Sequence, residues 1–416
     1  MIRSVTLGLN TRNVDFSILE KRVPIFFNLA CRAFEDNSLS LRTKRIGLSS
    51  FNIKNLSDKA DALQDINSIS EICKKNDIRW FSVPFNMVGQ NHDLTSTTAL
   101  EVIKTYDNSF INFLATDKNV VDIDAIKSAA VFIQQVSQLS GSGFDNFRYG
   151  VAFNTEPNGA FFPFVHNEGE DGFSLALELI PTMVAAIKRS DDNGLVSLRS
   201  YIILALVKVL SLVNKICLEL EAESGIKYCG IDASLAPHPE SEESSIPFLM
   251  QLLGLPKFGQ AGTAFLAGYL TDIIKTAVLD SGIRATGFNG VMYSILEDPG
   301  FADVSMDVNS LPLSQLLSLS SICGCGVDML PVPGDISSAE LTCIMLDVAA
   351  KASWLNKPLG ARILPIPNKS TGDLTSFEHD FFVNGRIQNG LGSVDFNHDI
   401  GSGAESLFYY SRSSKL

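Results

Sequence analysis

The chain has 416 residues, 45% of them hydrophobic, and its 46 acidic and 33 basic side chains give a net charge of −13. This apolar content is enough for one large core or two smaller ones and excludes disorder as the dominant state. The negative charge disfavours a phosphate backbone or an anionic membrane surface, so we expect neither a nucleic-acid partner nor a membrane partner.

Residues 1–140 alternate strand-like and helix-like segments. Strand-like runs occupy 4–9, 45–51 and 78–85, and amphipathic helical patterns occupy 16–34, 57–76 and 121–139. This alternation predicts an α/β fold. The first 13 residues lack a long apolar run, so they read as a strand rather than a signal peptide.

Residues 141–172 are rich in glycine and asparagine and also crowded with aromatic residues, which is typical of a structured loop at a functional site. Three further helices are expected at 197–224, 259–279 and 337–354, and strand-like runs at 226–235, 287–296 and 361–367. The apolar stretch 201–220 contains Lys208 and Lys215, which favours a buried helix over a membrane span.

Neither a repeat nor a linker divides the chain. We therefore expect one large domain over 1–400, with an N-terminal α/β part (1–140) and a motif-bearing part (141–400), followed by a flexible tail (401–416). The seven cysteines lack CxxC pairs, so a disulfide scaffold and a structural zinc site are not expected.

Residues 320–340 form the most distinctive block. Glycines flank Cys325, and Asp328 and two prolines lead into a helix with a capping-box pattern, which predicts a tight loop able to hold an anion. Cys323 near a helix N-terminus would have a lowered pKa and act as a nucleophile, with Asp328 beside it as a second catalytic candidate. The alternative is a turn that needs its glycines only for close packing.

His238 lies between two prolines, with Glu240 nearby. A histidine on such a restricted backbone can serve as a general base or a metal ligand. An ordinary surface histidine is the alternative.

Several carboxylates are candidates for a divalent cation such as magnesium or calcium. Glu297 and Asp298 end an apolar strand, where ligands usually bind in open α/β sheets, and Asp232 follows another strand. Helix capping and structural ion pairs would explain the same residues.

Four residues are predicted to bind the substrate. Glu178 lies in an apolar run, so it needs a partner, and Arg148 is the nearest donor in sequence. Lys357 and Arg362 have the spacing of a clamp for a carboxylate or phosphate. A salt-bridge network between domains or subunits is the alternative.

The sequence ends in Ser414, Lys415 and Leu416, the receptor-read address of peroxisomal proteins. This tripeptide predicts the peroxisome matrix as the location and the peroxisomal import receptor as a partner.

The chain resembles the domain-of-unknown-function family 711, also called uncharacterised protein family 0210. The resemblance rests on strings spread over most of the chain: IRSVTLGL, GFDNFRYG, FFPFVHNEG, GIDASLAP, AGTAFLAGYL, GFNGVMYSILED, CGCGVDMLPVPGD and NKPLGARILPIPNKSTGD. It implies a fold similar to the ten-stranded α/β barrel of the pyruvate formate-lyase and ribonucleotide reductase group, with helices outside and a loop inside the barrel. It implies no established reaction.

In those barrel enzymes a cysteine becomes a thiyl radical, and Cys323 is its counterpart by resemblance. This chain has no glycyl-radical segment, since VNGRIQNG near Gly385 is a poor match. The family usually has a small hydroxyl residue where this chain has Cys325, which leaves a redox role for the two thiols open. The sequence thus predicts an enzyme acting on a small anionic metabolite, or alternatively a non-catalytic metabolite-binding or assembly-forming matrix protein. We expect a homo-oligomer in either case.

Overall fold

The computed structural model describes residues 1–12, 14–117, 120–192, 194–305, 313–388 and 402–406. Its strands are β1 (Ile2–Leu9), β2 (Leu41–Leu48), β3 (Trp80–Asn86), β4 (Ser109–Leu114), β5 (Thr116–Asp117), β6 (Val120–Asp122), β7 (Tyr149–Phe153), β8 (Gly172–Leu177), β9 (Lys227–Asp232), β10 (Gly326–Pro333), β11 (Leu359–Ile366) and β12 (Ala404–Ser406). Its α-helices are α1 (Phe16–Glu35), α2 (Leu56–Lys75), α3 (His92–Thr105), α4 (Ile123–Ser137), α5 (Ile180–Lys188), α6 (Leu195–Ser224), α7 (Ile246–Leu252), α8 (Thr263–Ser281), α9 (Pro299–Ser305), α10 (Leu313–Ile322) and α11 (Ser338–Leu355).

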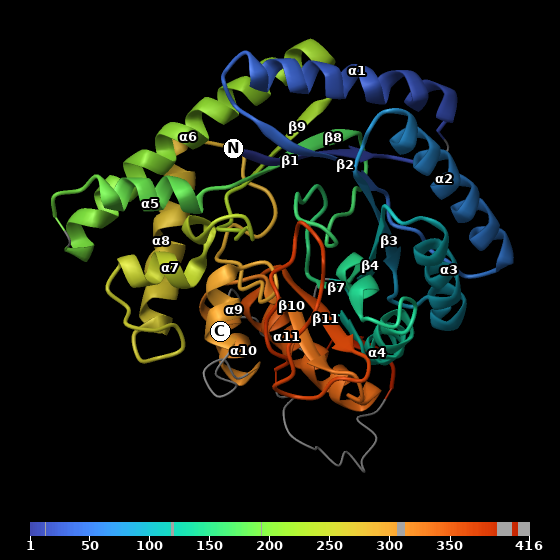
Figure 1. Cartoon of the computed structure of the whole chain (residues 1–416). Coiled ribbons are helices and arrows are strands. Elements are labelled where there is room, and N and C mark those ends of the chain that lie inside the picture. The colour runs from blue at the N-terminus through green and yellow to red at the C-terminus, as the bar shows by residue number, and fades with distance from the viewer. Residues whose placement is uncertain (13, 118–119, 193, 306–312, 389–401, 407–416) are drawn as a thin grey trace.

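Nine strands form one mixed sheet in the order β10-β11-β7-β4-β3-β2-β1-β8-β9. The five strands from β7 to β1 run parallel, and antiparallel pairs at β1–β8 and β7–β11 reverse the direction on both sides. In Figure 1 the strands lie in the middle of the molecule, and helices α1, α2 and α3 lie outside β1 to β4. The predicted α/β class is confirmed, and strands from both predicted parts share this sheet.

A regular strand was expected at 287–296, but the chain from 285 to 294 makes only isolated bridges. Ile231 and Leu235, in and after β9, pair with Ala285 and Val291, and Ser294 pairs with Asp328 of β10. The segment therefore contacts both edge strands of the sheet.

The aromatic loop between β7 and β8 is packed against the strands. The hydroxyl groups of Ser82 and Ser174 donate to the carbonyl oxygens of Val165 (2.6 Å) and Gly159 (2.9 Å). A Cβ on Gly150 of β7 would lie 2.5 Å from Pro163, so the strand must have glycine where the loop approaches it. The loop is structured, as its sequence predicted.

The predicted helices agree with the observed ones to within about four residues, because each has an apolar face that packs on the sheet. The capping box of Ser337 and Glu340 is confirmed at the start of α11. Helix α6 is the one helix in the described ranges that is long and apolar enough to cross a membrane. One side of it is buried, with Leu206, Leu210 and Val213 in the core.

Residues 402–406, within the predicted tail, contact the domain. Strand β12 pairs with β6, and the amide of Gly403 donates to Asp124 at 2.8 Å. These bonds attach the segment to the domain. The predicted targeting residues Ser414, Lys415 and Leu416 lie outside the described residues.

Candidate functional site

Charged and aromatic side chains enclose a small cavity, here called the arginine chamber, whose lining includes residues of β1 and β2 and of β10 and β11. Its charged walls come from β1, β2, β10, β11 and the segment after residue 294: Arg3, Arg45, Asp328, Arg362 and Glu297. Its aromatic walls are Trp80, Phe110, Phe147, Phe161, Phe162, Phe164, Phe288 and Phe381. The volume open to the centre of a water molecule is about 30 Å³, which is room for one or two waters.

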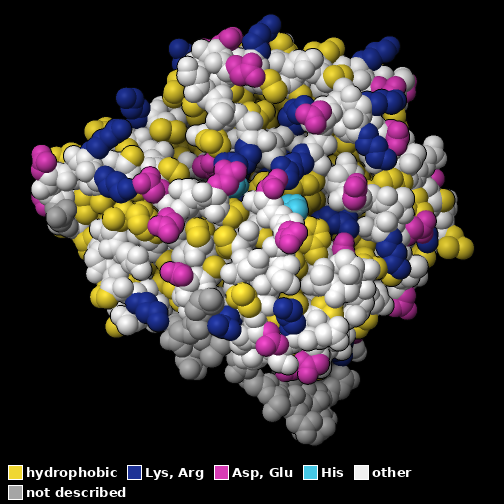
Figure 2. Space-filling view, viewed as in Figure 1, with side chains coloured by type: hydrophobic (Ala, Val, Ile, Leu, Met, Phe, Trp, Pro, Cys, Tyr) yellow, Lys and Arg dark blue, Asp and Glu magenta, His cyan; other side chains and the backbone are white. Residues whose placement is uncertain are grey.

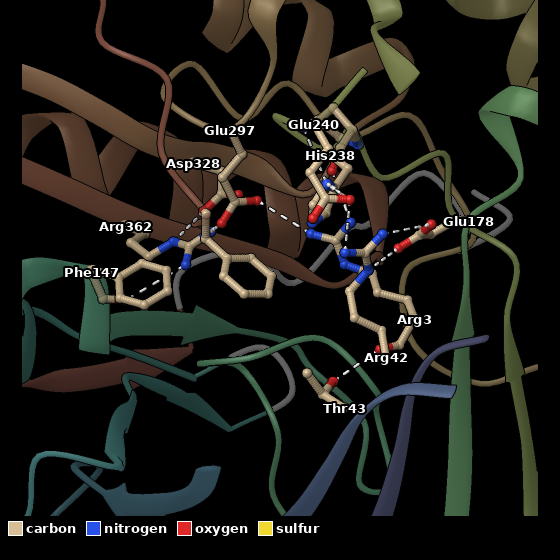
Figure 3. Close-up of polar contacts among 12 residues, drawn as sticks. Arg3, Arg42, Thr43, Phe147, Glu178, His238, Glu240, Glu297, Asp328 and Arg362 are labelled. Atoms are coloured by element: carbon tan, nitrogen blue, oxygen red, sulfur yellow. Dashed lines mark hydrogen bonds and ion pairs between the residues drawn. The ribbon is translucent and has the colours of Figure 1, made fainter. Parts of the chain in front are cut away.

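A chain of ion pairs crosses the chamber (Figure 3). Arg362 binds Asp328 with two hydrogen bonds, Nε to Oδ1 at 2.7 Å and Nη2 to Oδ2 at 2.9 Å, and reaches Glu297 at 3.1 Å. Arg3 lies 3.5 Å from the other oxygen of Glu297. Burial alone would lower the pKa of Arg362, but the attraction of Asp328 and Glu297 outweighs it and holds the pKa above its usual value.

Arg45 is the exception in this chamber. It is 4% exposed, and its Nε donates to the hydroxyl of Thr43 at 3.0 Å. Its guanidinium lies 5.1 Å from the ring centres of both Trp80 and Phe162, and it forms no ion pair with any described residue. Burial, followed by repulsion from Arg3, lowers the pKa of Arg45 to about 9. The arginine therefore remains charged at neutral pH without a counterion.

A second charged cluster adjoins the chamber. Arg42 donates to Glu178 at 2.7 Å and to Glu240 at 3.0 Å, and Figure 3 shows this cluster beside Arg3 and His238. In Figure 2, basic and acidic side chains are intermixed around a histidine near the centre of the same face. Arg3 and Arg42, one from each cluster, lie at the amino ends of β1 and β2.

His238 is buried in this second cluster, not exposed as the alternative had it. Its Nδ1 accepts a hydrogen bond from the amide of Glu240 at 3.3 Å, while its Nε2 has no partner within the described ranges. Burial, followed by repulsion from Arg3 and Arg42, lowers the pKa of His238 to about 4. The ring is therefore neutral at pH 7, and it is a weak base.

The two central cysteines differ in position. Cys323 follows the last residue of α10, so the prediction that it lies near a helix N-terminus is wrong. Its sulfur accepts a hydrogen bond from the amide of Val291 at 2.9 Å. Cys325 instead lines the arginine chamber, and burial, followed by the charge of Asp328, raises its thiol pKa well above the usual value.

The glycines of the 320–340 segment allow close packing of the backbone. Gly326 has a φ of 101°, and a Cβ there would lie 2.9 Å from the amide nitrogen of Gly360 on the neighbouring strand. The start of α11 is satisfied by its own Ser337 and Glu340, so the anion site predicted there is not open. The alternative of a closely packed turn explains this block better.

The three predicted metal ligands have separate partners. Asp232 accepts hydrogen bonds from the amides of Phe288 and Asn289, and Asp298 accepts from the amides of Ile246 and Gly300. Glu297 belongs to the chamber's ion pairs. Across the ranges that the structure describes, three or more His, Cys, Asp or Glu side chains do not converge as a metal ion requires.

Neither of the two predicted pairings of substrate-binding residues is present in the structure. Arg148 does not reach Glu178; its guanidinium donates to Asp145 at 2.8 Å and to backbone carbonyls at the end of α3. Lys357 and Arg362 do not form a clamp, because Lys357 precedes β11 near the carboxyl end of β7, whereas Arg362 lies near the amino end of β7. Sequence neighbours were poor guides to spatial neighbours here.

Sequence reasoning missed Arg3, Arg42 and Arg45. Each is an arginine within a short strand of β-branched and apolar residues, and a charge in such a strand is itself a signal, because it must find partners when buried. The predicted Asp328, Glu297 and Arg362 do converge in one cavity.

The curved mixed sheet and its enclosed charges define an α/β protein with a buried arginine–carboxylate site. The chain matches the family described as Uncharacterised ACR (DUF711) over residues 1–384, and it belongs to that family.

Relatives of this chain occur in archaea and bacteria. A UPF0210 protein of Sulfurisphaera tokodaii is 24% identical over 384 residues, 88% of this chain and 85% of the relative. A UPF0210 protein of Pyrobaculum aerophilum is 26% identical over 271 residues, 64% of this chain and 58% of the relative, so the match spans less than two thirds of that protein. A UPF0210 protein of Oenococcus oeni is 31% identical over 153 residues, 37% of this chain and 34% of the relative.

Proposed function

We propose that the protein is an enzyme that binds a small anionic metabolite in the arginine chamber and acts on it there. The observation that carries this proposal is Arg45, a buried cation without a counterion in a chamber of three arginines and two carboxylates. A buried charge is costly unless it is paired, so a bound carboxylate or phosphate would supply the missing partner. Trp80 and Phe162 hold the guanidinium plane in place for it.

Access to the chamber requires movement of its cover. Residues 372–388 form a covering segment, held by backbone bonds from Val383 to Leu296 (2.8 Å) and from Gln388 to Pro331 (2.9 Å). Phe381 of this segment lines the chamber, and Arg79 stacks against it at 4.9 Å. Displacing Phe381, which lines the chamber, would open the space that a metabolite needs.

A non-catalytic binding role is the second candidate, and a specific observation favours it. The thiol of Cys325 is protonated and His238 has a pKa of about 4, so neither group is suited to proton transfer at neutral pH. Native mass spectrometry with turnover assays on retained metabolites separates the two roles.

Trp80 provides the direct test because it touches Arg45. In a Trp354→Phe background, Trp80 is the only tryptophan, and its fluorescence should respond saturably to formate, acetate or phosphate. Arg45→Met should weaken this response at least about tenfold, the effect of losing roughly 1.4 kcal/mol of binding. Arg12→Met, beyond the carboxyl end of β1, should leave the fluorescence response unchanged. An absent response, or an equal one in Arg45→Met, would overturn the proposal.

For the fold, we propose that the sheet closes into the ten-stranded barrel of the pyruvate formate-lyase-like group. The bridges of 285–294 to β9 and β10 support this, because they would supply the tenth strand between the two edges. The five parallel strands and the reversed strands around them fit the same arrangement. A crystal structure with an open gap between β9 and β10 would contradict it.

For location, we propose import into the peroxisome matrix through Ser414, Lys415 and Leu416, on the strength of the tripeptide alone. A fluorescent protein fused in front of the full chain should co-localise with a peroxisomal marker, and deletion of the three residues should leave it in the cytosol. Cytosolic fluorescence of the intact fusion would refute the targeting.

A further inference from the structure

A second cavity lies at the carboxyl ends of the parallel strands, whereas the arginine chamber lies near their amino ends. We call it the strand-end pocket, and the argument uses Arg12, Asn52, Asn154, His166, Glu168 and Lys357 among its lining residues. Its volume is about 860 Å³, within the range of about 300–1,000 Å³ that is usual for ligand sites.

The topology of the sheet makes this edge a natural ligand site. Strands β1, β2, β3, β4 and β7 are parallel, so the residues that follow them meet at one edge. Ligands of open α/β sheets bind at the carboxyl ends of the strands, where successive loops diverge. The chamber with Arg45 lies at the other end of the same strands, so the two sites are separate.

Lys357 is the cation of the pocket without a counterion. It is half-buried, burial lowers its pKa, and within the described part of the chain its ammonium group has no hydrogen bond or ion pair. Arg12, by contrast, is neutralised by Glu168 at 2.9 Å, and Ser50 also donates to Glu168. A ligand with an anionic group would therefore be drawn to Lys357.

The remaining polar groups of the pocket are mostly unused donors. The amide oxygens of Asn52 and Asn154 already accept hydrogen bonds, at 3.0 Å and 3.4 Å, while no described residue accepts from their amide nitrogens. His166 is 5% exposed, and its Nδ1 has no partner among the described side chains and backbone groups. Glu156, on the exposed rim, is an acceptor for hydroxyl groups.

We propose that the strand-end pocket binds a hydroxylated small molecule with one anionic group, which pairs with Lys357 while its hydroxyl and acid oxygens accept hydrogen bonds from Asn52 and Asn154. A sugar acid and a polyol phosphate share this chemistry. The site needs no contribution from the arginine chamber.

Calorimetry on the full chain tests this with three probes. Gluconate presents a carboxylate with hydroxyl groups, glycerol 3-phosphate presents a phosphate, and sorbitol presents hydroxyl groups alone. At least one of the two acids should bind while sorbitol does not, and the stronger one identifies the anionic group. If neither acid binds, or if sorbitol binds equally well, the proposal is overturned.

Variants locate the binding. Lys357→Met should raise the dissociation constant of the bound acid at least about tenfold, as loss of a charged contact does, whereas Lys208→Met on the exposed side of α6 should leave it unchanged. Because Lys357→Met can also disturb folding, the acid should in addition slow acylation of Lys357 in the unmodified protein. Unchanged binding in Lys357→Met, or unprotected Lys357, contradicts the assignment.

Discussion

Arg45 and Arg362 are buried to the same extent in the same chamber, yet their surroundings differ. Arg362 has two carboxylate partners, while Arg45 lies between two aromatic rings. Burial lowers the pKa of both guanidinium groups, but the carboxylate partners of Arg362 outweigh it and hold that pKa above its usual value, whereas the pKa of Arg45 falls to about 9. This difference is the reason for assigning Arg362 a structural role and for proposing Arg45 as the ligand-binding arginine.

The two arginines should differ in their effects on stability. Arg362→Met leaves Asp328 buried without a partner and Glu297 with Arg3 alone, and we expect a loss of about 3–5 kcal/mol in the free energy of unfolding. Arg45→Met removes an uncompensated charge and a cation–π contact together, so the change should stay below about 1 kcal/mol. Urea denaturation followed by circular dichroism measures both. Equal losses would show that Arg45 has a structural partner of its own.

His166 makes the stability of the protein depend on pH. Burial lowers its pKa to about 4, from an unfolded value of about 6.5, so the unfolded state binds the proton first as pH falls. The contribution is complete above pH 6.5, and about 2 kcal/mol of it is lost by pH 5. His238 has a similarly lowered pKa and adds to the loss in the same window.

The measurement compares the unfolding free energy at pH 7 and pH 5 for the unmodified chain and for His166→Gln, which cannot titrate. The variant should lose about 2 kcal/mol less between the two pH values. His92→Gln is a control of opposite sign, because a hydrogen bond to Asp122 raises the pKa of that ring. The same pH slope in His166→Gln and the unmodified chain would mean that His166 is protonated in the folded protein.

At the scale of elements, the local sequence pattern was enough to predict those helices whose formation depends on a single segment of the chain. Helices α1, α2 and α4 have apolar faces on the sheet, and their periodicity was enough to place them. Helix α10 was missed because the exposed side chains within its run of leucines and serines, such as Ser314 and Ser318, carry no charge, and that omission put Cys323 before a helix instead of after one.

The site was less predictable because it joins distant segments. Arg3 meets Glu297, and Arg362 meets the loop just before β7, across more than 200 residues of sequence in each case. Which strands become neighbours depends on the order of the sheet, and no local spacing encodes that order. Candidate residues could therefore be chosen by chemistry, as Asp328, Glu297 and Arg362 were, but their partners could not. Their predicted roles in catalysis and substrate binding stay predictions.

At the scale of the whole molecule, the outer helices suggest how copies of the chain assemble. Tyr201, Leu204 and Leu212 lie on the exposed side of α6 with exposed fractions of 54%, 69% and 42%, and Phe265 on the adjoining α8 is 63% exposed. Figure 1 shows the two helices side by side at the edge of the molecule. Exposed apolar side chains gathered on two adjoining helices are typical of a protein interface, and we propose that they form the contact of the homo-oligomer expected from the sequence.

Leu204→Glu should therefore convert an oligomer into a monomer, because it places a charge in the middle of the proposed contact. Light scattering after size-exclusion chromatography gives the mass of each form against the 45.2 kDa of one chain. Leu56→Glu is the matched control, since Leu56 is 74% exposed at the start of α2, on another side of the molecule. A monomeric unmodified chain would rule out the oligomer, and an oligomer that persists in Leu204→Glu would place its interface away from α6.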